Sequence, residues 1–283
     1  MHDSLAILTC GSIGVTRRCL SRMASSTRFQ RQAEFVVVDN GSTDGTREWL
    51  DGDFRHTCEE RGLGLTLIFN DRNMGCSTAR NQAVAAAKGD AVFFLDNDVE
   101  PATPDWLEAL RARLDSDQGI GIVGGLLLYP PRDGGNASVP IVQCASVGVS
   151  RSGRIRFIGR GEPLADAHLV SHEAQCLISA CMAMRRDQCI SIGGFDEAFN
   201  PVQFEDFDLC YRCREAGWKA FYEPKAMMFH HESTTTAASP KNAAIVVRHG
   251  LEFKRRWRHM FSAEDGPDES ECRWIANPNA ALP

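Results

Sequence analysis

Acidic side chains stand in three clusters along this chain of 283 residues. Asp39 follows a short apolar run, Asp96 and Asp98 follow a second apolar run, and Glu205 and Asp206 open a predicted helix. Carboxylates at the ends of buried parallel strands face the crevice where open α/β sheets bind ligands. The order of the clusters therefore predicts one cleft that holds a nucleotide, then a metal, then an acceptor to be deprotonated.

The sequence Asp96-Asn97-Asp98 predicts a metal site. Two carboxylates separated by one residue can hold Mg²⁺ or Mn²⁺, because these ions prefer hard oxygen ligands and keep substrate phosphate oxygens in their shell. The alternative is a polar strand end whose aspartates cap the next segment, since so short a motif recurs by chance. The preceding strand and the other acidic clusters favour the metal.

The acidic residues at 205–208 predict a general base. A helix N-terminus favours one acidic residue, but Glu205, Asp206 and Asp208 are three acids within four residues. Crowded carboxylates raise the pKa of one of them toward neutrality, which suits a general base. Phe204 and Phe207 beside them would help to remove water from the site.

Asp39 and the adjacent pair His230 and His231 are further candidates. Asp39 can accept a hydrogen bond from a base N–H or a ribose hydroxyl, or it can simply make an Asx-turn; we leave both open. A neutral imidazole at the end of a strand can complete the ligand set of Mn²⁺. Side chains alternate along a strand, so at most one histidine of the pair is a ligand.

The chain carries no other convincing site pattern. Cys210 and Cys213 form a lone C-x-x-C inside a predicted helix, with no second pair to complete a zinc site. The sequence contains no phosphate-binding P-loop pattern.

The first part of the chain alternates short apolar runs with helical patterns. The predicted strands are residues 5–9, 35–39, 63–69 and 91–95, and the predicted helices are 15–25, a short one ending near 50 and capped by Ser42 or Thr43, and 75–88. This alternation predicts an α/β fold with a mostly parallel, doubly wound sheet.

After Asp98 the pattern loosens. We expect a helix over 104–114, a strand over 120–128 broken at Gly124 and Gly125, a loop over 129–138, a hairpin over 142–158 turning at residues 152–153, a polar mobile segment over 159–175, strands at 176–184 and 220–229, and a terminal helix over 242–260. We assign 1–98 to nucleotide-sugar binding and 99–233 to the acceptor, both on one sheet. Residues 234–262 form a C-terminal helical extension, and 263–283 a poorly ordered tail.

The composition is that of a globular protein, with 43% hydrophobic and 24% charged residues. The net charge of −6 argues against general nucleic-acid binding. We see neither a signal peptide nor an apolar run long enough to span a bilayer, so we expect a cytoplasmic protein whose 11 cysteines are reduced thiols.

The terminal helix carries a basic flank of Lys254, Arg255, Arg256 and Arg258. This flank can make a peripheral contact with an anionic membrane surface and bring a lipid-linked acceptor near. The alternative is a solvated helix packed through Ile245, Leu251 and Trp257. We favour the solvated helix because the chain as a whole is negatively charged.

With these residues in hand, the chain resembles the GT-A glycosyltransferases of family 2, which include rhamnosyl- and galactofuranosyltransferases. The matching motifs are spread over residues 5–233 and follow the order of the family. They are 37–46 (VVDNGSTDGT), 73–81 (NMGCSTARN), 94–98 (FLDND), 193–199 (GGFDEAF), 205–209 (EDFDL) and the pair at 230–231 (HH).

The resemblance implies roles for the matching positions. It implies a metal-dependent, inverting transfer of one sugar from a nucleotide-sugar donor to a hydroxyl of a glycan, lipid-linked or small-molecule acceptor. The implied base is Asp206, with Glu205 as second choice, and Arg80 would order the D-x-D loop. The implied metal ligands for Mn²⁺ or Mg²⁺ are Asp96, Asp98 (closest to the metal) and His230, with His231 as the fallback. The implied donor-binding residues are Thr9, Asp39, Ser42, Asn73, Asp96 and Asn97.

The chain departs from the family in its first motif. Residues 9–12 read Thr-Cys-Gly-Ser, where the family commonly has Thr-Tyr-Asn-Arg. The aromatic residue that would stack on the base is missing, which leaves UDP-, dTDP- and GDP-linked donors open. The membrane-spanning tail and the Q-x-x-R-W motif of polymerising members are also absent, which favours addition of a single sugar.

Two other classes of protein remain as alternatives. A nucleotide-sugar nucleotidylyltransferase or hydrolase is also α/β and metal-dependent, but it would not need the segment 193–196. Residues 11–18 offer only a weak version of the Gly-rich basic loop that nucleotidylyltransferases usually carry. A non-catalytic carbohydrate-binding relative would have lost metal ligands or the base, and none is lost.

Overall fold

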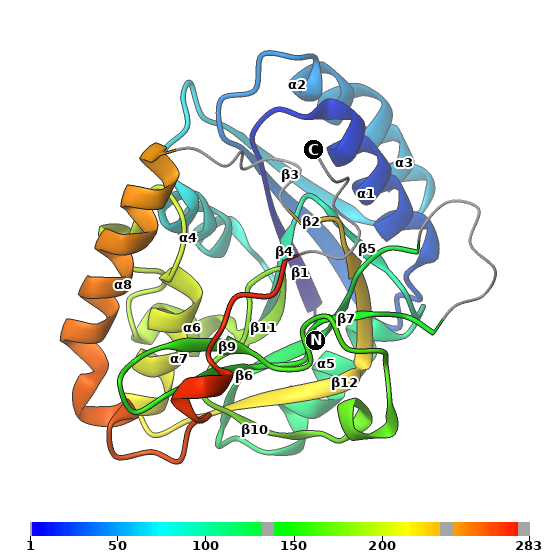
Figure 1. Ribbon diagram of the computed structural model, residues 1–283. Coiled ribbons are helices and arrows are strands. Elements are labelled where there is room, and N and C mark those ends of the chain that lie inside the picture. Colours follow the sequence, from blue (N-terminus) through cyan, green and yellow to red (C-terminus); the bar gives the residue numbers. More distant parts are fainter. Residues whose placement is uncertain (1, 132–138, 233–239, 277–283) are drawn as a thin grey trace.

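The computed structural model describes residues 2–131, 139–232 and 240–276 (Figure 1). Its strands are β1 (His2–Thr9), β2 (Gln32–Asp39), β3 (Gly64–Phe69), β4 (Ala91–Asp96), β5 (Val99–Pro101), β6 (Ile120–Leu128), β7 (Val142–Cys144), β8 (Val147–Val149), β9 (Ile155–Phe157), β10 (His172–Ala174), β11 (Cys181–Arg185) and β12 (Lys219–His230). Its main helices are α1 (Ile13–Ser26), α2 (Thr46–Trp49), α3 (Arg55–Glu60), α4 (Cys76–Ala86), α5 (Trp106–Ser116), α6 (Arg186–Ser191), α7 (Glu205–Glu215) and α8 (Pro240–Phe261).

One sheet runs through both halves of the chain, in the order β10-β12-β6-β11-β4-β1-β2-β3. The pairs β1–β2, β1–β4 and β2–β3 are parallel, as predicted for the first half. The strand β11 is antiparallel to both β4 and β6, so β6 and its parallel neighbour β12 again point the same way as β4. The carboxyl ends of β2, β4 and β12 consequently meet at one edge of the sheet.

Helices cover both faces of the sheet, which confirms the predicted doubly wound class. Figure 1 shows α1 and α3 on one side, and α4, α6 and α7 on the other with α8 outside them. The central strands are buried on both faces, so β2 and β4 consist of continuous apolar runs instead of alternating patterns.

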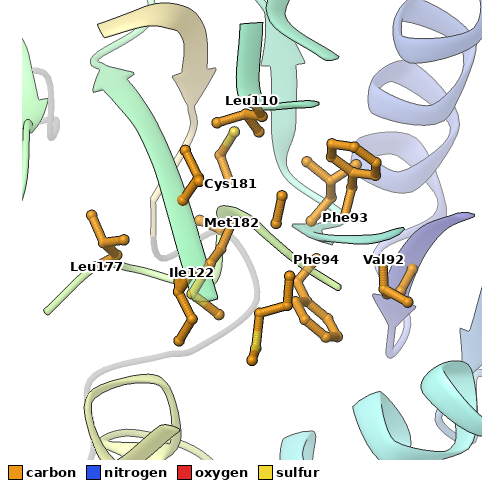
Figure 2. Packing of buried hydrophobic residues seen from close by; sticks show 14 of the residues in the cluster. Val92, Phe93, Phe94, Leu110, Ile122, Leu177, Cys181 and Met182 are labelled. Atoms are coloured by element: carbon orange, nitrogen blue, oxygen red, sulfur yellow. The ribbon is translucent and has the colours of Figure 1, made fainter. Parts of the chain in front are cut away.

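The strand β4 joins the two layers of the core. Phe93 and Phe94 are both fully buried and point to opposite sides of their strand (Figure 2). The ring of Phe93 meets Trp106 of α5 edge-on at 6.4 Å, and the ring of Phe94 meets Phe195 at 4.9 Å. The packing of the apolar part of β4 therefore fixes the position of Asp96, the last residue of this strand.

The strand β6 runs unbroken through Gly124 and Gly125, so the predicted break is wrong. A Cβ on Gly124 would lie 2.8 Å from the side chain of Leu177, and a Cβ on Gly125 would lie 2.5 Å from the carbonyl oxygen of Ala226. The two glycines allow close approach of neighbouring chain segments instead of ending the strand.

The segment 159–175, which we predicted to be polar and mobile, has a regular structure. It contains a 3₁₀ turn, η2 (Asp166–Leu169), and then β10, which pairs with β12 as an edge strand. An edge strand can keep polar side chains in solvent, so the polarity of this segment did not indicate the absence of regular structure. The predicted hairpin is present as β8–β9. Of the predicted loop 129–138, residues 132–138 lie outside the described residues.

The helix α8 packs against α7 through aromatic rings. Phe253 contacts Tyr211 at 5.3 Å, and Trp257 contacts the same ring at 5.6 Å. Ile245 and Trp257 are buried as predicted, but Leu251 is 64% exposed, so its predicted packing role is wrong.

The basic flank of α8 is partly neutralised by acids of the protein itself. Arg255 and Arg256 both bind Glu252, and Arg256 also binds Asp196. Within the described residues, none of the helices combines the length and the apolar character needed to cross a bilayer.

The structure also differs from the expectation of a poorly ordered tail. Residues 263–276 follow a defined path that includes a 3₁₀ turn, η4 (Glu269–Glu271), capped by the side chain of Asp268. Residues 277–283 lie outside the described part of the chain.

We predict that Phe94→Ala lowers the free energy of unfolding by about 3–5 kcal/mol. The substitution removes a buried ring from the first half of the chain that packs on Phe195 in the second half. Ile190→Ala is the control, because this side chain is half exposed and its loss should cost less than about 1 kcal/mol. Urea unfolding measures both. Equal losses in the two variants would contradict the role of Phe94.

Candidate functional site

The side chains at the carboxyl edge of the sheet come from four elements. Asp39 is the last residue of β2, Asp96 is the last residue of β4, and His230 is the last residue of β12. Asp206 lies in the first turn of α7, which begins at Glu205. The strand directions bring these positions together, as the sequence predicted.

Asp39 has one carboxylate oxygen bound by the protein and one that is not. Its Oδ2 accepts hydrogen bonds from the Ser42 amide at 3.1 Å and from Arg47 Nε at 2.7 Å. Its Oδ1 is buried and has no hydrogen-bond partner among the described residues. A buried charged oxygen without a partner is costly, which makes Oδ1 an acceptor for a ligand N–H or O–H. The local hydrogen bond to the Ser42 amide is present, and a contact between Oδ1 and a nucleotide stays a prediction.

Ser42 lies next to Asp39, and Asn73 lies next to Asn40, the residue that follows Asp39. Ser42 Oγ accepts a hydrogen bond from the Gly11 amide at 2.6 Å, so this side chain holds the loop after β1. Asn73 is exposed, and its Nδ2 lies 3.4 Å from Cys10 Sγ. Neither Ser42 nor Thr43 caps the next helix, because α2 begins only at Thr46, whose amide and hydroxyl bind Asp44.

Thr9 and Asn97 are buried beneath the site. Asn97 Nδ2 donates to Thr16 Oγ1 at 2.8 Å, and Thr9 Oγ1 lies 2.8 Å from the same hydroxyl. These side chains tie the ends of β1 and β4 to α1. Thr9 is the cross-strand partner of Asp39, and a direct donor contact by Thr9 or Asn97 stays a prediction.

Asp96, Asp98 and His230 form the candidate metal centre. Each offers one ligand atom, and these three atoms lie within 4.8 Å of one another. His230 Nε2 is 3.2 Å from Asp98 Oδ1, and His230 Nδ1 is 2.7 Å from Gln143 Oε1. An amide oxygen only accepts, so Nδ1 carries a proton, and Nε2 is the ring atom that faces Asp98 and can serve as a ligand. Two carboxylates and a neutral imidazole suit Mn²⁺ or Mg²⁺.

His231 faces a different partner. Its Nε2 lies 2.8 Å from Glu100 Oε1, and Glu100 also binds Arg18. The structure thus brings His230, and not His231, to the aspartates. Gln143 was missed by the sequence analysis because it comes from a segment without any recognisable motif, and Arg47 was missed because nothing in the sequence pairs it with Asp39.

A single arginine joins the metal centre to α7. Arg80 donates from Nη2 to Asp96 Oδ1 and from Nη1 to Glu205 Oε1, both at 2.7 Å. The Arg80 side chain is buried, and its guanidinium lies 5.3 Å from the centre of the Phe195 ring. The aspartate pair and the acidic helix therefore lie on the same side of the molecule.

The three acids in the first turn of α7 have three different environments. Asp208 binds Trp257 Nε1 and Arg212, so it anchors α8. Glu205 binds Arg80 through one oxygen, and its Oε2 is buried without a partner in the described structure. Asp206 accepts from the Phe207 amide at 2.9 Å and the Ser179 amide at 3.3 Å.

Asp206 is poised to exchange a proton near neutral pH. Burial raises the pKa of its carboxyl to about 7, and the Glu205 carboxylate adds to this, while Arg80 opposes it. A carboxylate with such a pKa can remove a proton from a hydroxyl at neutral pH. The sequence predicted this shift from the crowding of acids, but burial contributes more.

Comparison with known proteins agrees with this geometry. The sequence profile described as "Glycosyl transferase family 2" matches residues 4–193, which is more than half of the chain. The chain belongs to glycosyl transferase family 2. It is therefore a glycosyltransferase, and the resemblance inferred from its motifs is confirmed.

Two curated relatives align along nearly the whole chain of this family 2 glycosyltransferase. The protein y4gI of Sinorhizobium fredii is 30% identical over 99% of this chain, which spans only 29% of the length of y4gI. The N-acetylglucosaminyl-diphospho-decaprenol L-rhamnosyltransferase of Mycobacterium tuberculosis is 29% identical over 94% of this chain and 86% of its own length.

Solved structures share the GT-A fold at low identity. GalNAc-T7, solved with UDP, GalNAc and Mn²⁺, superposes with a TM-score of 0.69 at 17% identity, over 92% of this chain and 49% of its own. The mannosyltransferase PcManGT of Pyrobaculum calidifontis, in complex with GDP-Man and Mn²⁺, gives 0.63 at 19% identity, over 94% of this chain and 65% of its own.

We predict that Asp206→Asn makes the metal-free family 2 glycosyltransferase more stable than the wild type, and that this gain in the free energy of unfolding is larger at pH 8 than at pH 5. The raised pKa means that the folded chain holds the Asp206 proton more tightly than the unfolded chain, whose value is near 3.8. Wild-type stability therefore falls relative to the variant as the pH rises from about 4 to about 7, by on the order of 1–4 kcal/mol.

Urea unfolding at the two pH values measures this difference. Asp187→Asn, on the exposed face of α6, is the control and should show no such trend. A stability difference between wild type and Asp206→Asn that does not change with pH would contradict the raised pKa.

We also predict that Gln143→Leu weakens Mn²⁺ binding by about 10- to 100-fold, because His230 loses the partner that fixes its tautomer and ring orientation. Electron paramagnetic resonance of free Mn²⁺ during a titration measures the affinity. Gln32→Leu is the control, because Gln32 is exposed at the end of β2 that lies away from Asp39 and the candidate site. Equal affinities in the two variants would show that Gln143 does not orient the ligand.

Proposed function

We propose that this glycosyltransferase is metal-dependent and inverting, and that it moves one sugar from a UDP-, dTDP- or GDP-linked donor to a hydroxyl of the acceptor. The observation that carries the proposal is the Arg80 bridge. One arm of its guanidinium binds the candidate metal ligand Asp96, and the other binds Glu205, the residue next to the candidate base Asp206. The leaving group and the attacking hydroxyl would thus be held by groups that are fixed to each other.

The donor would lie along the edge from β2 to β4. Asp39 Oδ1 supplies an acceptor for the nucleotide, and Ser42 and Asn73 lie beside it. Asp96, Asp98 and His230 would hold Mn²⁺ or Mg²⁺, and the bound ion would neutralise the charge that develops on the diphosphate leaving group. The neighbours solved with Mn²⁺ and nucleotide-sugars support this assignment.

Asp206 would act as the general base. In its ionised form its carboxylate takes the proton of the acceptor hydroxyl, while the hydroxyl oxygen attacks the anomeric carbon on the face opposite the diphosphate. The bond to the diphosphate then breaks and the configuration inverts. The name of the mycobacterial relative favours an acceptor that itself carries a sugar on a lipid diphosphate.

A thermal-shift panel of UDP-, dTDP- and GDP-sugars with and without Mn²⁺ tests the donor and the metal. We expect one nucleotide to raise the melting temperature only when Mn²⁺ is present, since a ligand stabilises the state that binds it. Asp98→Asn should abolish this shift, and Asp187→Asn should preserve it. A full shift in the presence of EDTA would remove the metal from the proposal.

Release of the nucleoside diphosphate from the matching donor tests the base. Asp206→Asn should keep the thermal shift but lower the release rate by about 10²- to 10⁴-fold, because proton transfer is lost while donor contacts remain. In the wild type, kcat/KM should rise with pH and level off above about pH 7, following the pKa of Asp206. Wild-type rates in Asp206→Asn would exclude Asp206 as the base.

A further inference from the structure

The C-terminal segment 263–276 folds back along the hairpin β8–β9 instead of leaving the molecule. Its contacts reach both the hairpin and α7 through hydrogen bonds and ion pairs. They are Arg214 to Glu264 at 2.8 Å, Ser152 Oγ to Glu269 at 2.7 Å, Arg156 to Glu271 at 2.8 Å and Arg160 Nε to the Ile275 carbonyl at 2.7 Å. Several anchors spread over this length fix the position of the segment.

Arg160 is the centre of these contacts. Its side chain is buried, and its Nη2 donates to both carboxylate oxygens of Glu232 at 2.8 and 2.9 Å. The guanidinium lies 4.2 Å from the centre of the Trp274 ring, which is close for a cation–π contact. Because Glu232 follows two residues after His230, Arg160 ties Trp274 to the end of β12.

Trp274 is held in place but left open to solvent. The edge of the Phe157 ring supports it at 5.8 Å and 86°, and Arg160 lies against its face, yet the residue remains 68% exposed. An indole that served only to anchor the segment would gain most by being buried. A large apolar ring that is fixed and exposed is instead prepared to bind a ligand at little entropic cost.

The supports of Trp274 contact Phe207 and Glu232, which lie close in sequence to the candidate base Asp206 and the candidate metal ligand His230. Phe157 also contacts Phe207 at 6.4 Å, and Phe207 follows Asp206 in α7. Trp274 is therefore linked through its supports to the first turn of α7 and to the end of β12. In the proposed reaction the acceptor hydroxyl meets Asp206, so the acceptor would approach near the first turn of α7.

A cavity of about 330 Å³ lies beside the same arginine. Phe157 forms one part of its wall, and charged side chains form much of the rest, among them Arg156, Arg160, Glu162, Glu271 and Arg273. Such groups can exchange hydrogen bonds with sugar hydroxyls. Trp274 lies between two lining residues, Arg273 and Ile275, but is not itself part of the wall. An aromatic ring packs against the apolar C–H face of a pyranose.

We propose that Trp274, held by Arg160 and Phe157, is the platform on which the pyranose ring of the acceptor packs. This inference rests on the proposed function, because it assumes a sugar-bearing acceptor that approaches Asp206. It makes Trp274 a residue that determines acceptor binding without contributing to donor binding or to proton transfer.

The test separates acceptor binding from the donor reaction. Saturation-transfer difference NMR measures binding of the methyl glycosides of glucose, galactose, mannose, rhamnose and N-acetylglucosamine to the wild type and to three variants: Trp274→Ala, Trp274→Phe and Trp218→Ala. Trp218 is a half-buried residue just before β12, at the opposite end of the strand from His230, and serves as the matched control. Donor turnover is measured on the same proteins without any acceptor, as the release of the nucleoside diphosphate when water takes the place of the acceptor hydroxyl.

We expect at least one glycoside to bind the wild type, with a dissociation constant that rises about tenfold in Trp274→Ala and less than about threefold in Trp274→Phe. Donor turnover should be unchanged in both, and Trp218→Ala should match the wild type in both measurements. If no glycoside binds, if Trp274→Ala binds as the wild type does, or if its donor turnover falls, the platform is overturned. A wild type that neither binds nor cleaves any donor would instead refute the proposed function.

Discussion

The charge of Arg80 is the constraint on which the site depends. A guanidinium this deeply buried is tolerated only when carboxylates accompany it, since burying an unpaired charge costs several kcal/mol. Asp96 and Glu205 supply these partners from elements 109 residues apart in the sequence (205 − 96 = 109). Folding can therefore satisfy Arg80 only by bringing β4 and α7 together, and the same ring, Phe195, that lies under Arg80 also packs on Phe94. The apolar core and the polar site are in this sense assembled by the same contacts.

The parts of the site that could be predicted are those that a strand presents at its end. Asp39 and Asp96 follow apolar runs that can only be buried strands, and strand direction then decides where their side chains lie. The raised pKa of Asp206 could be predicted because three acids within four residues crowd one another. Gln143 and Arg47 could not, because they lie in the three-residue strand β7 and the one-turn helix α2, whose positions no local pattern specifies. The same holds for β11, whose antiparallel insertion lets β12 deliver His230 beside Asp98.

Glycine and polar residues misled the sequence analysis for physical reasons. A Gly-Gly pair in a strand usually signals a break, but in β6 it admits Leu177 and the Ala226 carbonyl to the backbone. Polar segments usually indicate mobility, but β10 lies at the edge of the sheet, where its polar side chains His172 and Glu173 remain exposed to solvent. In both cases the deciding contact comes from a distant segment, so no window of local sequence contains it.

The two oxygens of the Asp39 carboxylate have different environments, and this difference has a consequence for which nucleobase the site can accept. One oxygen is already occupied by Ser42 and Arg47, so a nucleobase would meet a lone, negatively charged acceptor at Oδ1. Uracil, thymine and guanine carry an imino N–H on their pairing edge, which can donate to such an oxygen. Cytosine and adenine present a lone pair at the corresponding ring nitrogen, and two lone pairs repel. A carboxylate with one unpaired oxygen would thus favour nucleobases that carry an imino N–H over the others, independently of which sugar the donor carries.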